Sequence, residues 1–228
     1  MNIFTIPINQ SDNSITFYFL NIDAKLTSQF GKFTECWMDA AIEPIFNVLF
    51  EKANSVFIAN SAPELSNEDF SLLKKKGLML NFDCLNFILK GENENAGIIG
   101  QQGENFIGIS NTYLNSEKCT EEILFSVITH ELVHYYDNII SGEVSFYDRL
   151  SEADKAQFDD AWKYIVTVIS STEQEEFAGY YFDKDDFEKL TYCVEAYVLA
   201  LLCNSEELKS ELSDSLMLMV RISQKYIQ

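Results

Sequence analysis

The sequence predicts an α+β fold, with strands concentrated in the first half of the chain and helices in the second. Short alternating apolar segments and turn clusters dominate before residue 115, whereas long segments with a helical apolar period follow it. The hydrophobic fraction of 47% is that of an ordinary globular protein. We therefore expect a single domain over 1–228, with a small mixed or antiparallel sheet in an α/β half to about residue 115 and a helical half from about residue 116.

The first 60 residues contain a hairpin signal and a helix that contains a proline. Apolar alternation over 4–8, a polar cluster at 10–13 and a β-rich segment at 15–19 predict a β-hairpin. Helical spacing then extends over 25–52, but Pro44 lies within it and should kink or divide the helix.

The remaining elements follow from the same two periodicities. We expect strands at 55–59, 78–82, 85–89 and 105–110, and helices at 66–76, 121–140, 152–169, 185–202 and 205–227. The glycine-rich segment 91–105 is expected to be a loop.

Charge and composition exclude several classes of partner. The chain has 36 acidic and 16 basic residues, a formal net charge of −20, which opposes binding to nucleic acid or to an anionic membrane surface. No apolar run is long enough for a transmembrane helix, and the N-terminus has no signal-peptide pattern. Five widely spaced cysteines indicate reduced thiols. We expect a monomer that is cytoplasmic, or that a dedicated machinery secretes into a host cell.

The strongest functional signal is an H-E-x-x-H motif formed by His130, Glu131 and His134, which uses both histidines of the chain. Four residues turn a helix by about 400°, so the two imidazoles lie on one face, one turn apart, and can ligate one Zn²⁺ ion. Glu131 lies beside both and can act as a general base toward water. The alternative is a pair of structural histidines on a half-buried helix.

A third protein ligand must be a carboxylate, because no histidine remains; His₂Glu zinc sites have this composition. Asp137 lies about 10.5 Å along the helix axis from His130, too far for tetrahedral convergence. We therefore interpret Asp137 as a residue that orients a histidine ring.

Glu195 is the first candidate for the third ligand. It is the only charged residue in the apolar segment 190–201, and a buried carboxylate needs a cation. The alternative is that Glu195 faces solvent, as charged residues usually do. Glu188 and Glu175 are the next candidates, in acidic segments that look like exposed faces.

The segment His130-Glu131-Leu132-Val133-His134, followed by a glutamate on a later helix, resembles the zincin metallopeptidases of the glutamate-ligand branch. Within that group, HELVHYYD and YCVEAY resemble the lethal-factor-like catalytic domains of bacterial toxins and small bacterial effector zinc proteases. The resemblance covers roughly residues 98–204. It implies a zincin-like fold, Zn²⁺ as the cofactor, and endopeptidase activity in a virulence toxin or effector. Lethal-factor-like domains carry a ligand glutamate where this chain has Thr191.

The resemblance also implies how a substrate would bind. A protein or peptide would pair in extended form with an edge strand before the motif helix, and 105–110 is well placed for this; the alternative is an ordinary core strand. Such sites use a tyrosine to stabilise the oxyanion, and we choose Tyr192 because it lies one turn from Glu195 on the same face.

Together these observations predict a zinc-dependent endopeptidase with His130, His134 and Glu195 as metal ligands and Glu131 as general base. Two alternatives are a non-catalytic zincin-like interaction module and a zinc hydrolase that acts on a non-peptide amide.

Overall fold

The computed structural model describes residues 2–7, 14–20, 22–52, 55–60, 67–68, 71, 100–103, 106–109, 114–117, 119–141, 145–171 and 185–227. The chain divides into two compact units, the first comprising Met1–Thr34 and Phe50–Glu131 and the second Glu35–Leu49 and Leu132–Gln228. The α+β class is confirmed, with most of the described residues in helices. The expectation of one domain over 1–228 stays a prediction.

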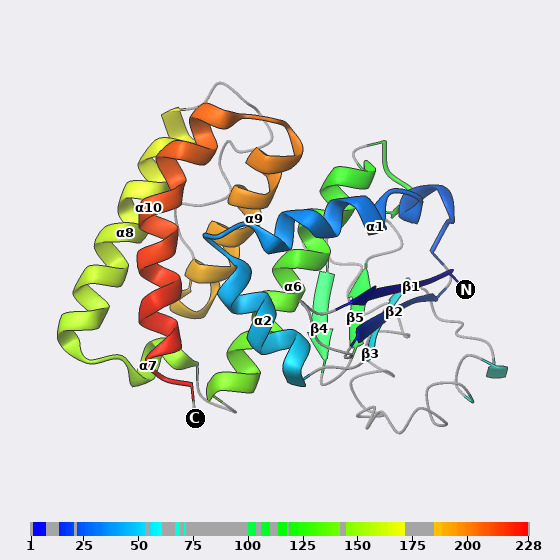
Figure 1. The fold of residues 1–228 in the computed structure, drawn as a ribbon, viewed down its shortest axis with the longest axis horizontal. Coiled ribbons are helices and arrows are strands. Elements are labelled where there is room, and N and C mark those ends of the chain that lie inside the picture. The colour runs from blue at the N-terminus through cyan, green and yellow to red at the C-terminus, as the bar shows by residue number, and fades with distance from the viewer. Residues whose placement is uncertain are drawn as a thin grey trace. The chain divides into compact units, whose positions relative to one another are not determined.

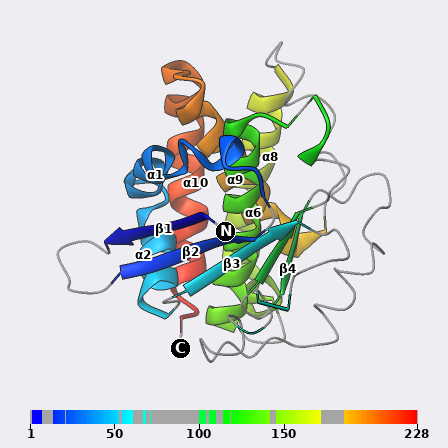
Figure 2. The ribbon, with the colours of Figure 1, turned by 90° about the vertical axis from the view of Figure 1, so that its right-hand side faces the viewer.

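The first unit contains a five-stranded sheet of order β1-β2-β3-β5-β4 (Figures 1 and 2). Its strands are β1 (Asn2–Pro7), β2 (Ser14–Leu20), β3 (Ser55–Asn60), β4 (Gly100–Gly103) and β5 (Phe106–Ile109). β1 and β2 pair antiparallel, which confirms the predicted hairpin. β3 pairs parallel with both β2 and β5, and β4 pairs antiparallel with β5, so the sheet is mixed.

Two expectations about this sheet are wrong. The segment expected to be a loop contains β4. β5, proposed as an edge strand, lies between β3 and β4, which is the alternative of an ordinary core strand. Because β4 has the sequence Gly-Gln-Gln-Gly, it carries no apolar alternation that would reveal a strand. Within the described sheet, the edge strands are β1 and β4.

The predicted helix over 25–52 is divided, as Pro44 suggested. It consists of η1 (Lys25–Thr27), α1 (Phe30–Phe33), η2 (Thr34–Met38) and α2 (Glu43–Lys52). Pro44 is the second residue of α2, in the first turn, where a missing backbone N–H breaks no intrahelical hydrogen bond. The helix therefore restarts at Glu43, one residue before the proline.

An aromatic cluster connects the sheet of the first unit to the beginning of α6 (Glu121–Ser141). Phe17 and Phe19 lie two residues apart on β2, so they share one face of the sheet. Both rings contact Phe30, with centroids 5.2 and 4.8 Å apart, and Phe30 in turn contacts Phe125 of α6 at 5.3 Å. All four side chains are buried, so they fix the first turns of α6 in this unit.

The second unit is built mainly from helices, which confirms the predicted helical segments after residue 140. They are α7 (Phe146–Arg149), α8 (Glu152–Ser171), η3 (Asp186–Glu188), α9 (Lys189–Leu202) and α10 (Glu206–Gln224). α10 packs against both α8 and α9 (Figure 1). The sequence did not predict the short helix α7. The expected strands at 78–82 and 85–89, and most of the expected helix at 66–76, lie outside the described residues.

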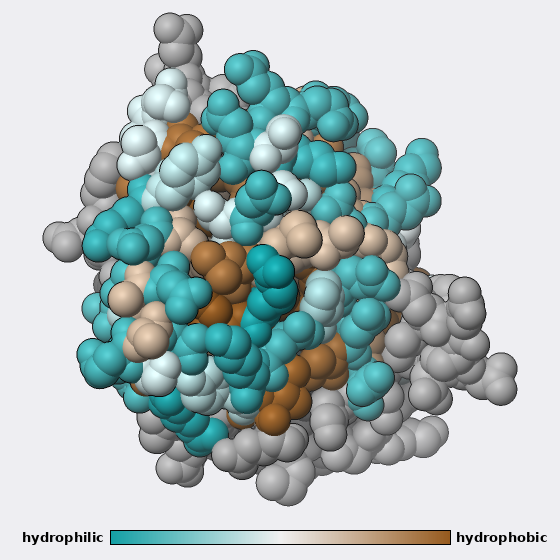
Figure 3. All heavy atoms as spheres, turned by 60° about the vertical axis from the view of Figure 1, so that its left-hand side comes forward, coloured by the Kyte–Doolittle hydropathy of each residue, from teal (hydrophilic) through white to brown (hydrophobic). Residues whose placement is uncertain are grey.

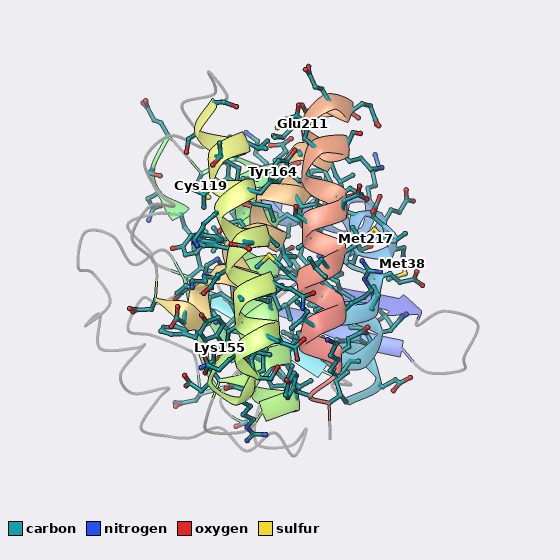
Figure 4. All side chains as sticks on the ribbon, turned by 90° about the vertical axis from the view of Figure 1, so that its left-hand side faces the viewer. Met38, Cys119, Lys155, Tyr164, Glu211 and Met217 are labelled. Atoms are coloured by element: carbon teal, nitrogen blue, oxygen red, sulfur yellow. The ribbon has the colours of Figure 1, made fainter. Side chains whose placement is uncertain are left out.

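The amphipathic pattern of α10 explains its place in this unit. The buried residues Leu208, Leu212, Leu216 and Met219 recur every three or four positions and form one face. The side of the molecule that includes α8 and α10 is mostly hydrophilic, with smaller hydrophobic areas among the hydrophilic residues (Figure 3). Tyr164 of α8, labelled in Figure 4, is one of its exposed large side chains.

None of the helices in the described part of the chain combines the length and the apolar character needed to cross a bilayer. The cysteines within this part, Cys36, Cys119, Cys193 and Cys203, are free thiols, as expected for them.

Asp39 connects three segments of the second unit. Its Oδ1 accepts hydrogen bonds from the Ala41 amide at 3.1 Å and from the Tyr197 hydroxyl of α9 at 2.8 Å. Its Oδ2 lies 3.0 Å from Nζ of Lys209 on α10. Burial opposes the charge on Asp39, but these hydrogen bonds outweigh it and hold the pKa of the carboxyl below its ordinary value.

This depressed pKa predicts a stability change in acid. The stabilisation by Asp39 is fully present above the unfolded-state pKa of about 3.9 and is lost as the pH falls through the lower folded-state pKa. We therefore expect the difference in free energy of unfolding between the wild type and Asp39→Asn to be constant between about pH 7 and 5 and to shrink below about pH 4. Urea denaturation at a series of pH values measures it, with Asp148→Asn, an exposed residue of α7, as control. A difference that persists unchanged at pH 2.5 contradicts the prediction.

Candidate metal centre

Helix α6 carries the H-E-x-x-H motif, and its sequence explains why a helix forms there. At its start, the Thr120 hydroxyl accepts a hydrogen bond from the Ile123 amide at 3.3 Å, and Glu121 and Glu122 lie in the first turn, where negative charge is favourable. One face is apolar and buried; it includes Leu124, Ile128, Leu132, Tyr136 and Ile140. This buried face holds the helix in place independently of the motif.

The motif histidines lie one turn apart on α6, and both are half-buried. Because α6 is continuous through both residues, helix geometry sets their relative position. Nε2 of His134 lies 3.3 Å from Oε2 of Glu188, the last residue of η3. One potential ligand atom each from His130, His134 and Glu188 lies within 4.8 Å of the others. In a search of the described residues for three potential ligand atoms close enough to hold a metal ion, the group found is His130, His134 and Glu188.

The donors and their spacing fit a zinc ion. Imidazole nitrogen and carboxylate oxygen are ordinary zinc ligands with bonds of about 2.0–2.2 Å. In tetrahedral geometry, two such ligand atoms lie about 3.3–3.6 Å apart. The 3.3 Å between His134 and Glu188 matches this spacing, and Oε2 of Glu188 is shielded from solvent. A cation between these atoms would bind both the imidazole nitrogen and the carboxylate oxygen.

Glu131 is buried beside the two histidines, with 5% of its surface exposed. Acidic side chains are seldom buried this completely, and in the described part of the chain only Glu131 and Asp137 are. Burial strengthens the interaction of a carboxylate with any charge or proton donor beside it. The position of Glu131 therefore suits a group that exchanges a proton with a bound water molecule.

Asp137, the second buried carboxylate, anchors α7. Its Oδ1 accepts a hydrogen bond from the Phe146 amide and its Oδ2 accepts one from the Ser145 hydroxyl, both at 2.9 Å. Ser145 also caps α7 by accepting a bond from the Tyr147 amide. The sequence-based role of Asp137 toward a histidine ring stays a prediction.

Phe187, which sequence reasoning missed, lies next to the candidate metal centre. Its ring centroid is 5.8 Å from that of His134, and 44% of its surface is exposed. It directly precedes Glu188, so the same short turn supplies a carboxylate and an aromatic ring to His134. No sequence pattern marked it, since its contact depends on how η3 docks against α6.

The other predicted site residues have different positions. Glu195 lies on α9 and is half-buried. It follows Glu188, the N-cap residue of α9, by seven residues, which is about 10.5 Å along the helix axis. Tyr192 lies between them on the same helix and is also half-buried. Glu175 falls outside the described residues. The assignments of Glu195 as a ligand and of Tyr192 as an oxyanion donor stay predictions.

Comparison of the chain with protein-family models, with curated proteins and with solved structures found no match.

Proposed function

We propose that the protein is a zinc-dependent endopeptidase of the zincin type. The observation that carries the proposal is the convergence of His130, His134 and Glu188 beside the buried carboxylate of Glu131. Two imidazoles and one carboxylate are the protein ligands of several catalytic zinc sites, in which a fourth position stays open for water or substrate. Bound there, zinc would lower the pKa of a water molecule and polarise the carbonyl of a substrate.

Glu131 would move the proton in peptide-bond hydrolysis. As the oxygen of a water molecule bonds to the carbonyl carbon, the Glu131 carboxylate accepts a proton from that water. It then returns this proton to the amide nitrogen as the C–N bond breaks, so that the amine leaves neutral. Its burial supports this role, because bulk water competes less for the proton.

The geometry favours Glu188 over Glu195 as the third ligand. The Glu188 carboxylate already lies at ligand spacing from His134. Glu195, the candidate that the sequence ranked first, stays the alternative, and Tyr192 stays the proposed oxyanion donor because it lies on α9 between the two glutamates.

A substrate strand would add to β4 rather than to β5. β5 is already paired on both sides, whereas β4 is an edge of the described sheet. β4 belongs to the same unit as His130 and Glu131. An extended protein or peptide substrate could pair its backbone with this edge, which requires no particular side-chain sequence.

Zinc content and peptide cleavage test the proposed function together. We expect about one zinc ion per chain by elemental analysis, and cleavage of a peptide library that stops on chelation and returns when zinc is restored. Cleavage that survives complete chelation contradicts the proposal. Zinc binding without any hydrolysis favours the non-catalytic interaction module, and hydrolysis confined to non-peptide amides favours the third alternative.

A further inference from the structure

Glu188 lies on a turn that has little apolar anchoring of its own. The 3₁₀ turn η3 comprises Asp186, Phe187 and Glu188, and none of these residues is buried. Inside the turn, the Glu188 amide donates a hydrogen bond to the Asp185 carbonyl at 2.9 Å. A ligand carboxylate must stay within a few tenths of an ångström of its place, so something outside the turn must hold it.

Lys189, the residue after Glu188, makes the connection. Its side chain is 11% exposed, and its Nζ lies 2.6 Å from Oδ1 of Asp186 and 2.7 Å from Oδ1 of Asp159 on α8. The first contact spans η3 itself, and the second ties the turn to a long helix of the same unit. The pair with Asp159, whose side chain is 30% exposed, is screened less than a pair between two exposed side chains.

Tyr147 of α7 completes the cluster. Its hydroxyl donates to the Asp159 carboxylate, 3.0 Å from each oxygen, and Nζ of Lys189 lies 4.7 Å from the centroid of its ring. α7 also packs directly against η3. The cluster of Tyr147, Asp159, Asp186 and Lys189 thus connects α7 and α8 to the two ends of the turn that carries Glu188.

We propose that this Lys189 cluster is a positioning element of the metal centre, holding the Glu188 carboxylate against His134. The inference rests on the proposed function in one respect: it requires that the centre binds a metal ion, but not that it hydrolyses peptides. Hydrogen-bonded partners behind a ligand orient it, and their loss typically weakens metal affinity about 10–100-fold. A role in folding alone would leave the coordination of the bound metal unchanged.

Lys189→Met tests the inference, because methionine keeps much of the side-chain length and removes the charge. We expect Zn²⁺ affinity, measured by competition with a chromophoric chelator, to fall about 10–100-fold. The visible absorption spectrum of the Co²⁺-substituted protein should change as well, and Lys189→Arg should lie closer to the wild type in both measurements. If Lys189→Met fails to fold, Asp159→Asn removes the same ion pair with little change in shape.

Lys155→Met is the matched control. Lys155 lies on α8, where Figure 4 labels it, and its Nζ is 5.3 Å from the same Tyr147 ring. It does not belong to η3, so its loss removes a cation from the ring without releasing the Glu188 turn. Equal zinc affinity and an equal Co²⁺ spectrum in Lys189→Met and the wild type overturn the inference and leave the proposed function intact. An equal loss in Lys155→Met also overturns it. A wild-type protein that binds no zinc overturns both.

Discussion

Glu131→Gln should lower kcat for peptide cleavage by about 10²–10⁴-fold while one zinc ion stays bound. Glutamine keeps the size of the side chain but cannot accept the proton that an attacking water must lose. Glu131 is buried beside the histidines and is not needed as a ligand, because His130, His134 and Glu188 supply three ligand atoms. Single-turnover cleavage of a selected peptide, together with elemental analysis of the same sample, measures both effects.

Glu122→Gln is the matched control, since Glu122 is a half-buried carboxylate in the first turn of the same helix. We expect it to cleave at nearly the wild-type rate. Activity close to the wild type in Glu131→Gln would exclude Glu131 as general base. Loss of zinc in that variant would instead indicate that Glu131 is needed for metal binding.

Glu188→Gln should weaken zinc binding by more than about 100-fold. This is a larger loss than that caused by removing a residue that only hydrogen-bonds to a ligand. The Glu188 carboxylate lies 3.3 Å from His134, so it would supply the negative charge of the ligand set. A neutral amide oxygen at that place is a much weaker zinc ligand than a carboxylate. Competition titration against a chromophoric chelator gives the affinity.

Glu195→Gln decides between the two candidate ligands, and Glu207→Gln, an exposed residue of α10, serves as control. If Glu188 is the ligand, Glu195→Gln should weaken zinc binding by no more than about 10–100-fold, the loss typical of a residue that only orients a ligand. The reverse order of losses would assign the ligand to Glu195, as the sequence first suggested. If both variants bind zinc as tightly as the wild type does, neither Glu188 nor Glu195 is a zinc ligand.

The sequence predicted the elements whose formation depends on local pattern. The hairpin of β1 and β2, the division of a helix at Pro44, and the long helices of the second unit all follow from periodicity and a proline position. It failed at β4 and α7, whose own residues carry no periodic pattern and which form through contacts with neighbouring segments. Gly100–Gly103 becomes a strand by pairing with β5, and α7 is anchored by the Asp137 carboxylate eight and nine residues earlier.

The candidate site divides in the same way. His130, Glu131 and His134 are local on one helix, so their spacing was sufficient to group them. The third ligand depends on how η3 docks, which no periodicity encodes. Glu188 was ranked below Glu195 because its acidic neighbours looked like an exposed face. Lys189 in fact lies 2.6 Å from one of these neighbours, Asp186, and 2.7 Å from Asp159 of α8, which a charge count along the sequence could not reveal.

The shallow packing of η3 bears on which metal the centre can prefer. His130 and His134 stand on a helix that is held in place by its buried opposite face, so the relative position of the two imidazoles is fixed. The turn with Glu188 buries no side chain, so position 188 can change its donor atom at little cost to the fold. A softer thiolate or imidazole donor there would favour copper or zinc more strongly than the present carboxylate, an oxygen donor of the kind that also suits manganese. Metal selectivity in this architecture can therefore evolve at one position, while the helical pair stays constant.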